Sequence, residues 1–235
     1  MTIGIQVDQR VSLAVSTVIF ALRPHPSTGL MTLWLPLVRR IREPYEGQWA
    51  LPGGPLEANE DLAASARHTL ERTTGLTPNY LEQLYAFGSL DRSHLGSAEE
   101  RHSDRVVSIV YWALVQPDEV ARAVDGENVE WFVADELPPL AFDHSEVVAY
   151  ALARLRAKIT YTPIAYGFLP PEFTLAELRA VHEAVLRTSL DPANFRRQAL
   201  ASDTLVPTGN SLQGTSHRPP ALYRFTAGVP PEERR

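Results

Sequence analysis

The stretch Gln48-Trp49-Ala50-Leu51-Pro52-Gly53-Gly54, continued by a segment that ends in Gly75-Leu76, decides how the first half of the chain folds. Its Pro-Gly-Gly run predicts a tight turn. Asn59 predicts the N-cap of a helix, and Gly75 predicts the C-terminal end of that helix. Three apolar residues recur every fourth position, so one face of the helix is expected to be buried: Leu62, Ala66 and Leu70.

The same stretch resembles a Nudix box, the signature of hydrolases of nucleoside diphosphates linked to another group. The family pattern is Gly-x5-Glu-x7-Arg-Glu-U-x-Glu-Glu-x-Gly-U, where U is an aliphatic residue. Its frame is in register at Gly54, Glu60, Leu70, Gly75 and Leu76. The chemistry differs, because His68-Thr69 replaces the Arg-Glu pair and Arg72-Thr73 replaces the Glu-Glu pair.

These replacements remove the carboxylates with which the family holds divalent cations. Hard cations prefer carboxylate oxygens, and the family supplies them at three positions with i, i+3, i+4 spacing. Here those positions are Thr69, Arg72 and Thr73. Glu71 lies about 100° around the helix, and the resemblance gives Glu60 mainly a structural role. We therefore expect no catalytic residue, no metal site and no metal cofactor.

The resemblance still implies a pocket for a nucleoside diphosphate sugar. We expect Arg72 to neutralise the diphosphate, because a guanidinium pairs with phosphate oxygens in a bidentate manner. The alternative is an exposed arginine near Glu71. The candidate effector-binding residues are Arg39, Arg40, Trp49, Gly53, Gly54, Arg72, Arg92 and Arg105. Surface salt bridges for the arginines and core packing for Trp49 are the alternative interpretations. Four histidines have no metal-ligand spacing and are expected to be solvated or packed: His68, His94, His102 and His144.

Length and composition indicate two domains without disulfides or a membrane span. The chain has 235 residues, no cysteine and a net charge of −6. It contains no apolar run long enough for a transmembrane helix and no signal peptide, so we expect a cytoplasmic protein. Residues 1–157 carry a charge of −8, and residues 158–235 carry +2. Only the second part has a charge balance that tolerates a polyanion.

Residues 1–157 are predicted to form an α/β sandwich, because strands and helices alternate along them. The predicted elements are strands over 11–22, 30–38, 84–90, 106–115 and 127–133, and a helix over 145–159. Residues 160–171 contain three prolines and are interpreted as a linker.

The segment 158–235 is predicted to form a winged helix-turn-helix domain. Thr174 and Glu177 form a capping box before one helix, and Asp191-Pro192 starts a second helix after a three-residue turn. Residues 204–208 and 221–225 can pair as a hairpin, the wing. Residues 226–235 are expected to be a disordered tail.

The second helix of this pair has the side chains of a DNA-recognition helix. A projection at 100° per residue places Pro192, Ala193, Phe195, Ala199 and Leu200 on the buried side. Asn194, Arg197, Gln198 and Ala201 fall on the other side. Asn and Gln can bind adenine, and Arg can bind guanine, in the major groove. The candidate DNA-binding residues are Asn194, Arg196, Arg197, Gln198, His217, Arg218 and Arg224.

Both halves together resemble the NrtR family, Nudix-related transcriptional regulators of NAD metabolism. The residues that carry the resemblance are Leu51-Pro52-Gly53-Gly54, Asp104-Arg105-Val106-Val107-Ser108, Leu140-Ala141-Phe142-Asp143-His144, Phe173-Thr174-Leu175-Ala176-Glu177-Leu178, Asn194-Phe195-Arg196-Arg197 and Leu222-Tyr223-Arg224-Phe225. The resemblance implies an N-terminal Nudix-like α/β/α sandwich and a C-terminal winged helix-turn-helix domain. It also implies a homodimer that represses NAD synthesis or salvage genes from a palindromic operator in double-stranded DNA. The implied effector is ADP-ribose or a related NAD-derived metabolite. The polar insertion 93–103 departs from the family.

Two other classes of function remain open at this point. A working hydrolase of ADP-ribose-like substrates with an accessory tail predicts magnesium-dependent release of AMP. A ligand-binding protein whose tail docks onto another protein predicts no salt-sensitive binding to DNA.

Overall fold

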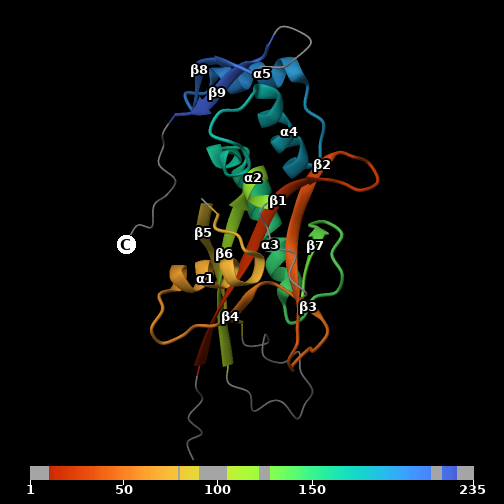
Figure 1. The fold of residues 1–235 in the computed structure, drawn as a ribbon, viewed down its shortest axis with the longest axis vertical. Helices are drawn as coiled ribbons and strands as arrows, with labels where there is room; N and C mark the ends of the chain where they lie inside the picture. The colour runs from red at the N-terminus through yellow and green to blue at the C-terminus, as the bar shows by residue number, and fades with distance from the viewer. Residues whose placement is uncertain (1–10, 79, 90–104, 122–127, 213–218, 227–235) are drawn as a thin grey trace, which may run out of the picture.

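The protein, analysed as a computed structural model, is described over residues 11–78, 80–89, 105–121, 128–212 and 219–226. Figure 1 shows a sheet-based region with β3 and β4 at one end of the molecule, and α5, β8 and β9 at the other. Several predictions fall outside the described residues: those for Arg92, the insertion 93–103, His94, His102, His217, Arg218 and all of the predicted tail except Thr226.

A seven-stranded mixed sheet forms the N-terminal region. Its main path is β3 (Trp49–Ala50), β2 (Met31–Arg39), β1 (Val11–Pro24), β6 (Arg105–Val115) and β5 (Tyr80–Phe87). The strands β4 (Gly53–Pro55) and β7 (Val129–Val133) pair with β1 and β2 respectively. Strands β1 and β6 are parallel over their whole overlap, from Val11 beside Arg105 to Ala21 beside Val115.

Helices cover both faces of this sheet. Alternate residues of β1 point to opposite faces, so each set packs against a different helix. Val18, Phe20 and Leu22 share a buried cluster with helix α3 (His144–Lys158). Ile19 and Ala21 pack with helix α1 (Leu62–Thr74) on the other face. A short helix α2 (Pro117–Val120) follows β6. The predicted α/β/α sandwich is confirmed.

The C-terminal region is the predicted winged helix-turn-helix. Helix α4 (Leu175–Leu186) begins with the predicted capping box, in which the Glu177 backbone N–H donates to Thr174 Oγ1 at 3.2 Å and the Thr174 N–H donates to Glu177 Oε2 at 2.7 Å. Helix α5 (Pro192–Ala201) begins at Asp191, whose carboxylate accepts from the Asn194 N–H at 2.8 Å. Strands β8 (Leu205–Ser211) and β9 (Ala221–Phe225) form the wing.

Two local expectations are corrected. Asp61, not Asn59, caps α1, because its carboxylate accepts from the Ala64 N–H at 2.7 Å. Strand β5 begins at Tyr80 rather than Leu84, because the consecutive polar residues Glu82 and Gln83 interrupt its apolar pattern in the sequence. Gly75 ends α1 in a left-handed conformation with φ 68°, as predicted.

Residues 160–171 pack against both regions instead of forming a free linker. They contain the 3-10 helix η2 (Pro163–Phe168), in which Ile164 and Phe168 are 3% and 2% exposed. One buried cluster runs from β1 through η2 to α4 and Tyr223, because the apolar residues of η2 join the two cores. The domain boundary between residues 157 and 158 stays a prediction. It falls within the last turn of helix α3, which ends at Lys158.

Candidate functional site

The turn between β3 and β4 lies against the central strand β1. A Cβ added at Gly53 would lie 2.7 Å from Ser16 Oγ and 2.8 Å from the Val15 carbonyl oxygen, so this position requires glycine. A Cβ added at Gly54 would meet open space. The Thr17 N–H donates to the Pro52 carbonyl at 2.8 Å. These contacts fix the position of the turn on the sheet.

Trp49 and Leu51 join this turn to β7 and to the start of α3. The Trp49 ring meets the Phe132 ring edge-on, with centroids 5.1 Å apart, and its carbonyl accepts from the Ala141 N–H at 2.8 Å. The Leu51 N–H donates to Nδ1 of His144 at 2.9 Å, and His144 is 7% exposed. Because Nδ1 accepts, a neutral His144 carries its proton on Nε2. His144 is therefore a packed histidine, one of the two alternatives expected from the sequence.

A second group of aromatic residues surrounds Arg40. Its guanidinium lies 4.6 Å from the centre of the Phe142 ring, and its Nε donates to the Pro44 carbonyl at 2.7 Å. Burial lowers the pKa of Arg40, and the nearby charge of Glu43 opposes this effect. The ring of Tyr45 contacts Phe142 at 4.9 Å. Only Arg40 of this group was predicted from the sequence, because Tyr45 and Phe142 lie in separate loops and both have left-handed backbone conformations.

Of the other predicted effector residues, Arg39 lies next to this group, whereas Arg105 lies on β6 and Arg72 on α1. Nε of Arg39 donates to the Gly47 carbonyl at 3.2 Å. Arg105 starts β6, and its Nη2 donates to the Gly88 carbonyl at 2.9 Å. Arg72 is exposed on α1 and has no hydrogen bond or ion pair with any of the described residues. No hydrogen bond, ion pair or ring contact within the described ranges joins Arg72 or Arg105 to Trp49 or Arg40.

The divalent cation that a Nudix fold implies does not fit the residues at its usual helix positions. The Thr69 side chain is buried, 8% exposed, and the Thr73 hydroxyl donates to the backbone carbonyl of Thr69, so neither threonine offers a carboxylate or a free hydroxyl at the surface for a metal ion. Glu60 accepts from Nδ1 of His68 at 2.9 Å. In the part of the chain that the structure describes, no group of three or more His, Cys, Asp or Glu side chains could hold a metal ion.

The predicted orientation of α5 is wrong in part. Phe195 and Ala199 pack against the core as expected, but Pro192, Ala193 and Leu200 are exposed, and Leu200 is 44% exposed. The projection weighted every apolar residue equally, whereas α5 contacts the core only along a narrow line. Arg196 and Arg197 are exposed, and so is Arg224 on β9. These arginines stay candidates for DNA contacts.

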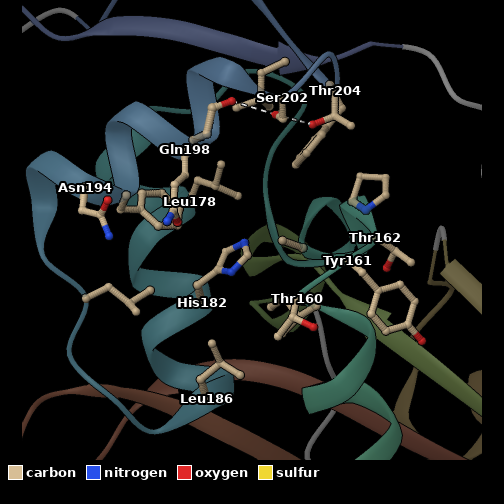
Figure 2. A pocket seen from close by; sticks show the side chains of 18 of the residues that line it. Thr160, Tyr161, Thr162, Leu178, His182, Leu186, Asn194, Gln198, Ser202 and Thr204 are labelled. Carbon is tan, nitrogen blue, oxygen red and sulfur yellow. Dashed lines mark hydrogen bonds between the residues drawn. The ribbon is translucent and has the colours of Figure 1, made fainter.

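Asn194 and Gln198 line a cleft beneath α5 of about 430 Å³. Its other walls are α4, residues 159–163 and, on the side of the wing, Thr204, Leu205 and Phe225 (Figure 2). His182 of α4 lies across the cleft from these amides, with its ring 5.3 Å from the Phe195 ring. Burial lowers the pKa of His182. Oδ1 of Asn194 accepts from Arg197 Nη2 at 2.6 Å, so these two predicted DNA-binding side chains are joined.

The turn between α4 and α5 is fixed by side chains of α4. The Leu190 N–H donates to Glu183 Oε1 at 2.8 Å, and the Leu190 carbonyl accepts from Arg179 Nη1 at 3.1 Å. Arg179 and Glu183 also pair with each other at 3.6 Å. The orientation of α5 therefore follows that of α4.

Two family models match the chain, one for each region. The model of the NUDIX domain matches residues 17–151. The model of the NrtR DNA-binding winged helix domain matches residues 165–225. Among the described residues, no helix is long and apolar enough to cross a lipid bilayer.

Individual proteins are similar over one or both regions. The ADPR responsive transcriptional repressor NtrR of Acinetobacter baylyi is 34% identical over 194 residues, which cover 80% of this chain and 74% of that protein. The crystal structure of Shewanella oneidensis NrtR complexed with a 27mer DNA superposes with a TM-score of 0.73 at 30% identity, covering 91% of this chain and 93% of that one. An ADP-ribose pyrophosphatase of Methanocaldococcus jannaschii is 32% identical over 112 residues, 48% of this chain and 62% of that enzyme.

Proposed function

Because the chain belongs to the NrtR family of transcriptional regulators, we propose that it is a DNA-binding repressor that responds to ADP-ribose or a related NAD-derived metabolite. The observation that carries the proposal is the arrangement of the two regions. A Nudix turn lies at one end of the molecule, and α5 and its wing lie at the other (Figure 1). Such a chain can bind a small effector and DNA at the same time, which linkage between the two sites requires.

The proposed effector site is the surface around the β3–β4 turn. Gly54 leaves open space for a ligand beside the backbone, Gly53 lets the turn pack on β1, and the side chains of Arg39 and Arg40 offer guanidinium groups to a diphosphate. The stacking of Arg40 on Phe142 reduces the entropy that Arg40 would lose on binding. Trp49 holds the turn in position. Arg72 and Arg105 are proposed to contact the ligand from α1 and β6, and Arg92 from outside the described residues.

We further propose that the site binds its ligand without hydrolysing it and without a metal ion. Support comes from the donors at the family's metal positions, two threonines and an arginine in place of carboxylates. The alternative is a hydrolase, favoured by the similarity of the Nudix region to an ADP-ribose pyrophosphatase. Incubation of the protein with ADP-ribose and Mg²⁺ or Mn²⁺ separates the two, because only the hydrolase releases AMP.

The proposed DNA contacts lie on α5 and the wing. A homodimer is proposed to place two copies of α5 in successive major grooves of a palindromic operator, one helical turn apart or a multiple of that distance. Arg196, Arg197 and Arg224 suit phosphate and base contacts, and His217 and Arg218, outside the described residues, are proposed to add to them. Asn194 and Gln198 are exposed at the edge of the cleft and are proposed to contact bases. The proposed targets are genes of NAD synthesis or salvage.

A mobility-shift titration on the promoter next to the protein's own gene tests this function. We expect binding at low salt that weakens steeply as salt rises, because phosphate contacts release counterions. ADP-ribose at saturating concentration is expected to change the operator Kd. A titration without any shift at low salt contradicts the repressor. A shift that ADP-ribose leaves unchanged contradicts the effector.

A further inference from the structure

Two routes of contacts lead from the Nudix turn to the winged helix and meet at one ion pair. The first route runs through α3, and the second runs through β7. Both end at Asp135 and Arg156, next to the C-terminal end of α4.

The first route begins at Leu51 in the turn. Its N–H donates to the buried His144 ring at the first residue of α3. Helix α3 then runs for 15 residues with one face buried against the sheet, so its two ends move as one rigid element. Arg156 lies in its last turn.

The second route begins at Trp49. Its ring contacts Phe132 of β7, and β7 is paired with β2 from Val129 to Val133. Asp135 follows two residues after this strand. A ligand that shifts the Trp49–Leu51 backbone therefore acts on both partners of the ion pair.

The ion pair holds the C-terminal end of α4. Nη2 of Arg156 donates to both carboxylate oxygens of Asp135, at 2.8 and 2.7 Å. Nε of the same guanidinium donates to the Val185 carbonyl at 3.0 Å, one of the last four carbonyls of α4 and so without a partner inside the helix. Arg187, the C-cap of α4, adds a contact from Nη1 to Asp135 Oδ1 at 3.6 Å. The side chains of Asp135 and Arg156 are only 18% and 30% exposed, so solvent screens the pair less than a surface salt bridge.

We propose that Asp135 and Arg156 are positioning residues that couple effector binding at the Nudix turn to the orientation of the winged helix. A displacement of this ion pair moves the C-terminal end of α4. The movement reaches α5 because Arg179 and Glu183 of α4 fix Leu190 in the turn before α5. The inference rests on the proposed function and adds the contacts that transmit the effect. Neither residue touches the effector or DNA in this scheme.

The test measures the operator Kd by fluorescence anisotropy, with and without saturating ADP-ribose, for wild type, Arg156→Met and Arg154→Met. Methionine keeps most of the side-chain volume and removes the guanidinium. Arg154 is the matched control, because it is exposed on the same helix and makes no hydrogen bond to the described residues of α4. Allosteric couplings typically change affinity about 5- to 150-fold. We expect such a change for wild type and Arg154→Met, and a change of less than about twofold for Arg156→Met. Calorimetry is expected to find ADP-ribose still bound by all three.

Failure of this inference differs from failure of the proposed function. A wild-type protein without any response to ADP-ribose contradicts the proposed function. A normal response in both wild type and Arg156→Met overturns the coupling role alone. If Arg156→Met does not fold, Asp135→Asn replaces it, because an amide of the same shape keeps the packing and weakens the ion pair. A full wild-type response in Asp135→Asn then overturns the inference, and a reduced response with ADP-ribose still bound supports it.

Discussion

Helices α1 and α5 begin with the same local signal but differ in how they are held. Each has an aspartate N-cap that accepts from a backbone N–H three residues later, at 2.7 Å for Asp61 and 2.8 Å for Asp191. Helix α1 buries five of its residues against the sheet, and α5 buries none completely. Helix α1 keeps the Nudix turn in place, whereas α5 leaves its surface available to a partner.

The two helices therefore differ in whether they expose chemically active side chains. In a Nudix hydrolase the first helix would expose carboxylates to a metal, but here its corresponding positions are packed or basic. In α5, by contrast, Arg196 and Arg197 remain exposed on a helix held mainly by Phe195 and Ala199. Substitutions can test whether the two helices have separate functions.

The largest effect is expected from the double substitution Arg196→Ala/Arg197→Ala on α5. We expect the operator Kd to rise about 100-fold, because each lost guanidinium contact to a base or phosphate contributes about 1–3 kcal/mol. The salt dependence of binding should decrease at the same time. Fluorescence anisotropy at several salt concentrations measures both quantities. An unchanged Kd would mean that α5 does not contact DNA.

Gly53→Ala is expected to destabilise the turn beside α1 by about 1–3 kcal/mol, the usual effect of forcing extra volume into a packed site. The added methyl group would meet Ser16 Oγ and the Val15 carbonyl. Gly54→Ala is the matched control, since its methyl group would point into open space. Urea unfolding followed by circular dichroism compares the two variants. Equal stabilities would show that the close approach at Gly53 is not required.

Arg72→Ala on α1 is expected to weaken ADP-ribose binding at least about tenfold in the absence of metal, because a charged hydrogen bond contributes about 1.5–3 kcal/mol. Operator binding without effector should not change, in contrast to the α5 variant. Isothermal titration calorimetry measures the ligand affinity. If ADP-ribose binds as tightly as before, Arg72 is simply an exposed arginine.

The two N-caps give a matched pair of smaller effects. Asp61→Ala and Asp191→Ala each remove one capping hydrogen bond, and each should reduce helix stability by about 1 kcal/mol. We expect Asp191→Ala to weaken operator binding, because burial contributes little to holding α5. Asp61→Ala should leave operator binding unchanged. The same loss of operator affinity in both variants would remove the distinction between the helices.

The smallest effect concerns pH and His182 beside the cleft. Burial lowers the pKa of His182 in the folded protein, so the unfolded chain binds a proton more readily. Its contribution to stability is therefore present above the ordinary histidine pKa of about 6.5 and is lost as the pH falls below that value. His182→Phe should flatten this part of the profile of unfolding free energy against pH. An unchanged slope would exclude His182 as its source.

The sequence predicted most of the fold because its signals are local. The capping box at Thr174, the Asp191-Pro192 start of α5 and the Gly75 end of α1 each depend on a few neighbouring residues. Helix α3 was also predicted to within one residue at each end, since apolar residues recur along it at helical spacing. The absence of carboxylates at Thr69, Arg72 and Thr73 likewise follows from residue identity alone.

The candidate site was predicted less completely, because its contacts join residues that are far apart in the chain. Leu51 and His144 are 93 positions apart, and Arg156 and Asp135 are 21 apart. No periodicity links such pairs. The covered side of α5 was predicted too wide for the same reason, since its neighbours on α4 and in residues 159–163 determine which residues are covered.

The sequence by itself determined the two modules, their order and the loss of the metal-binding residues, because capping, periodicity and side-chain chemistry act within a few residues. Only the tertiary structure determined that Trp49 rests on Phe132, that Asn194 and Gln198 border a cleft, and that Asp135 and Arg156 hold the end of α4. These contacts depend on how the sheet, α3 and α4 pack together. Packing of this kind is a property of the whole buried core.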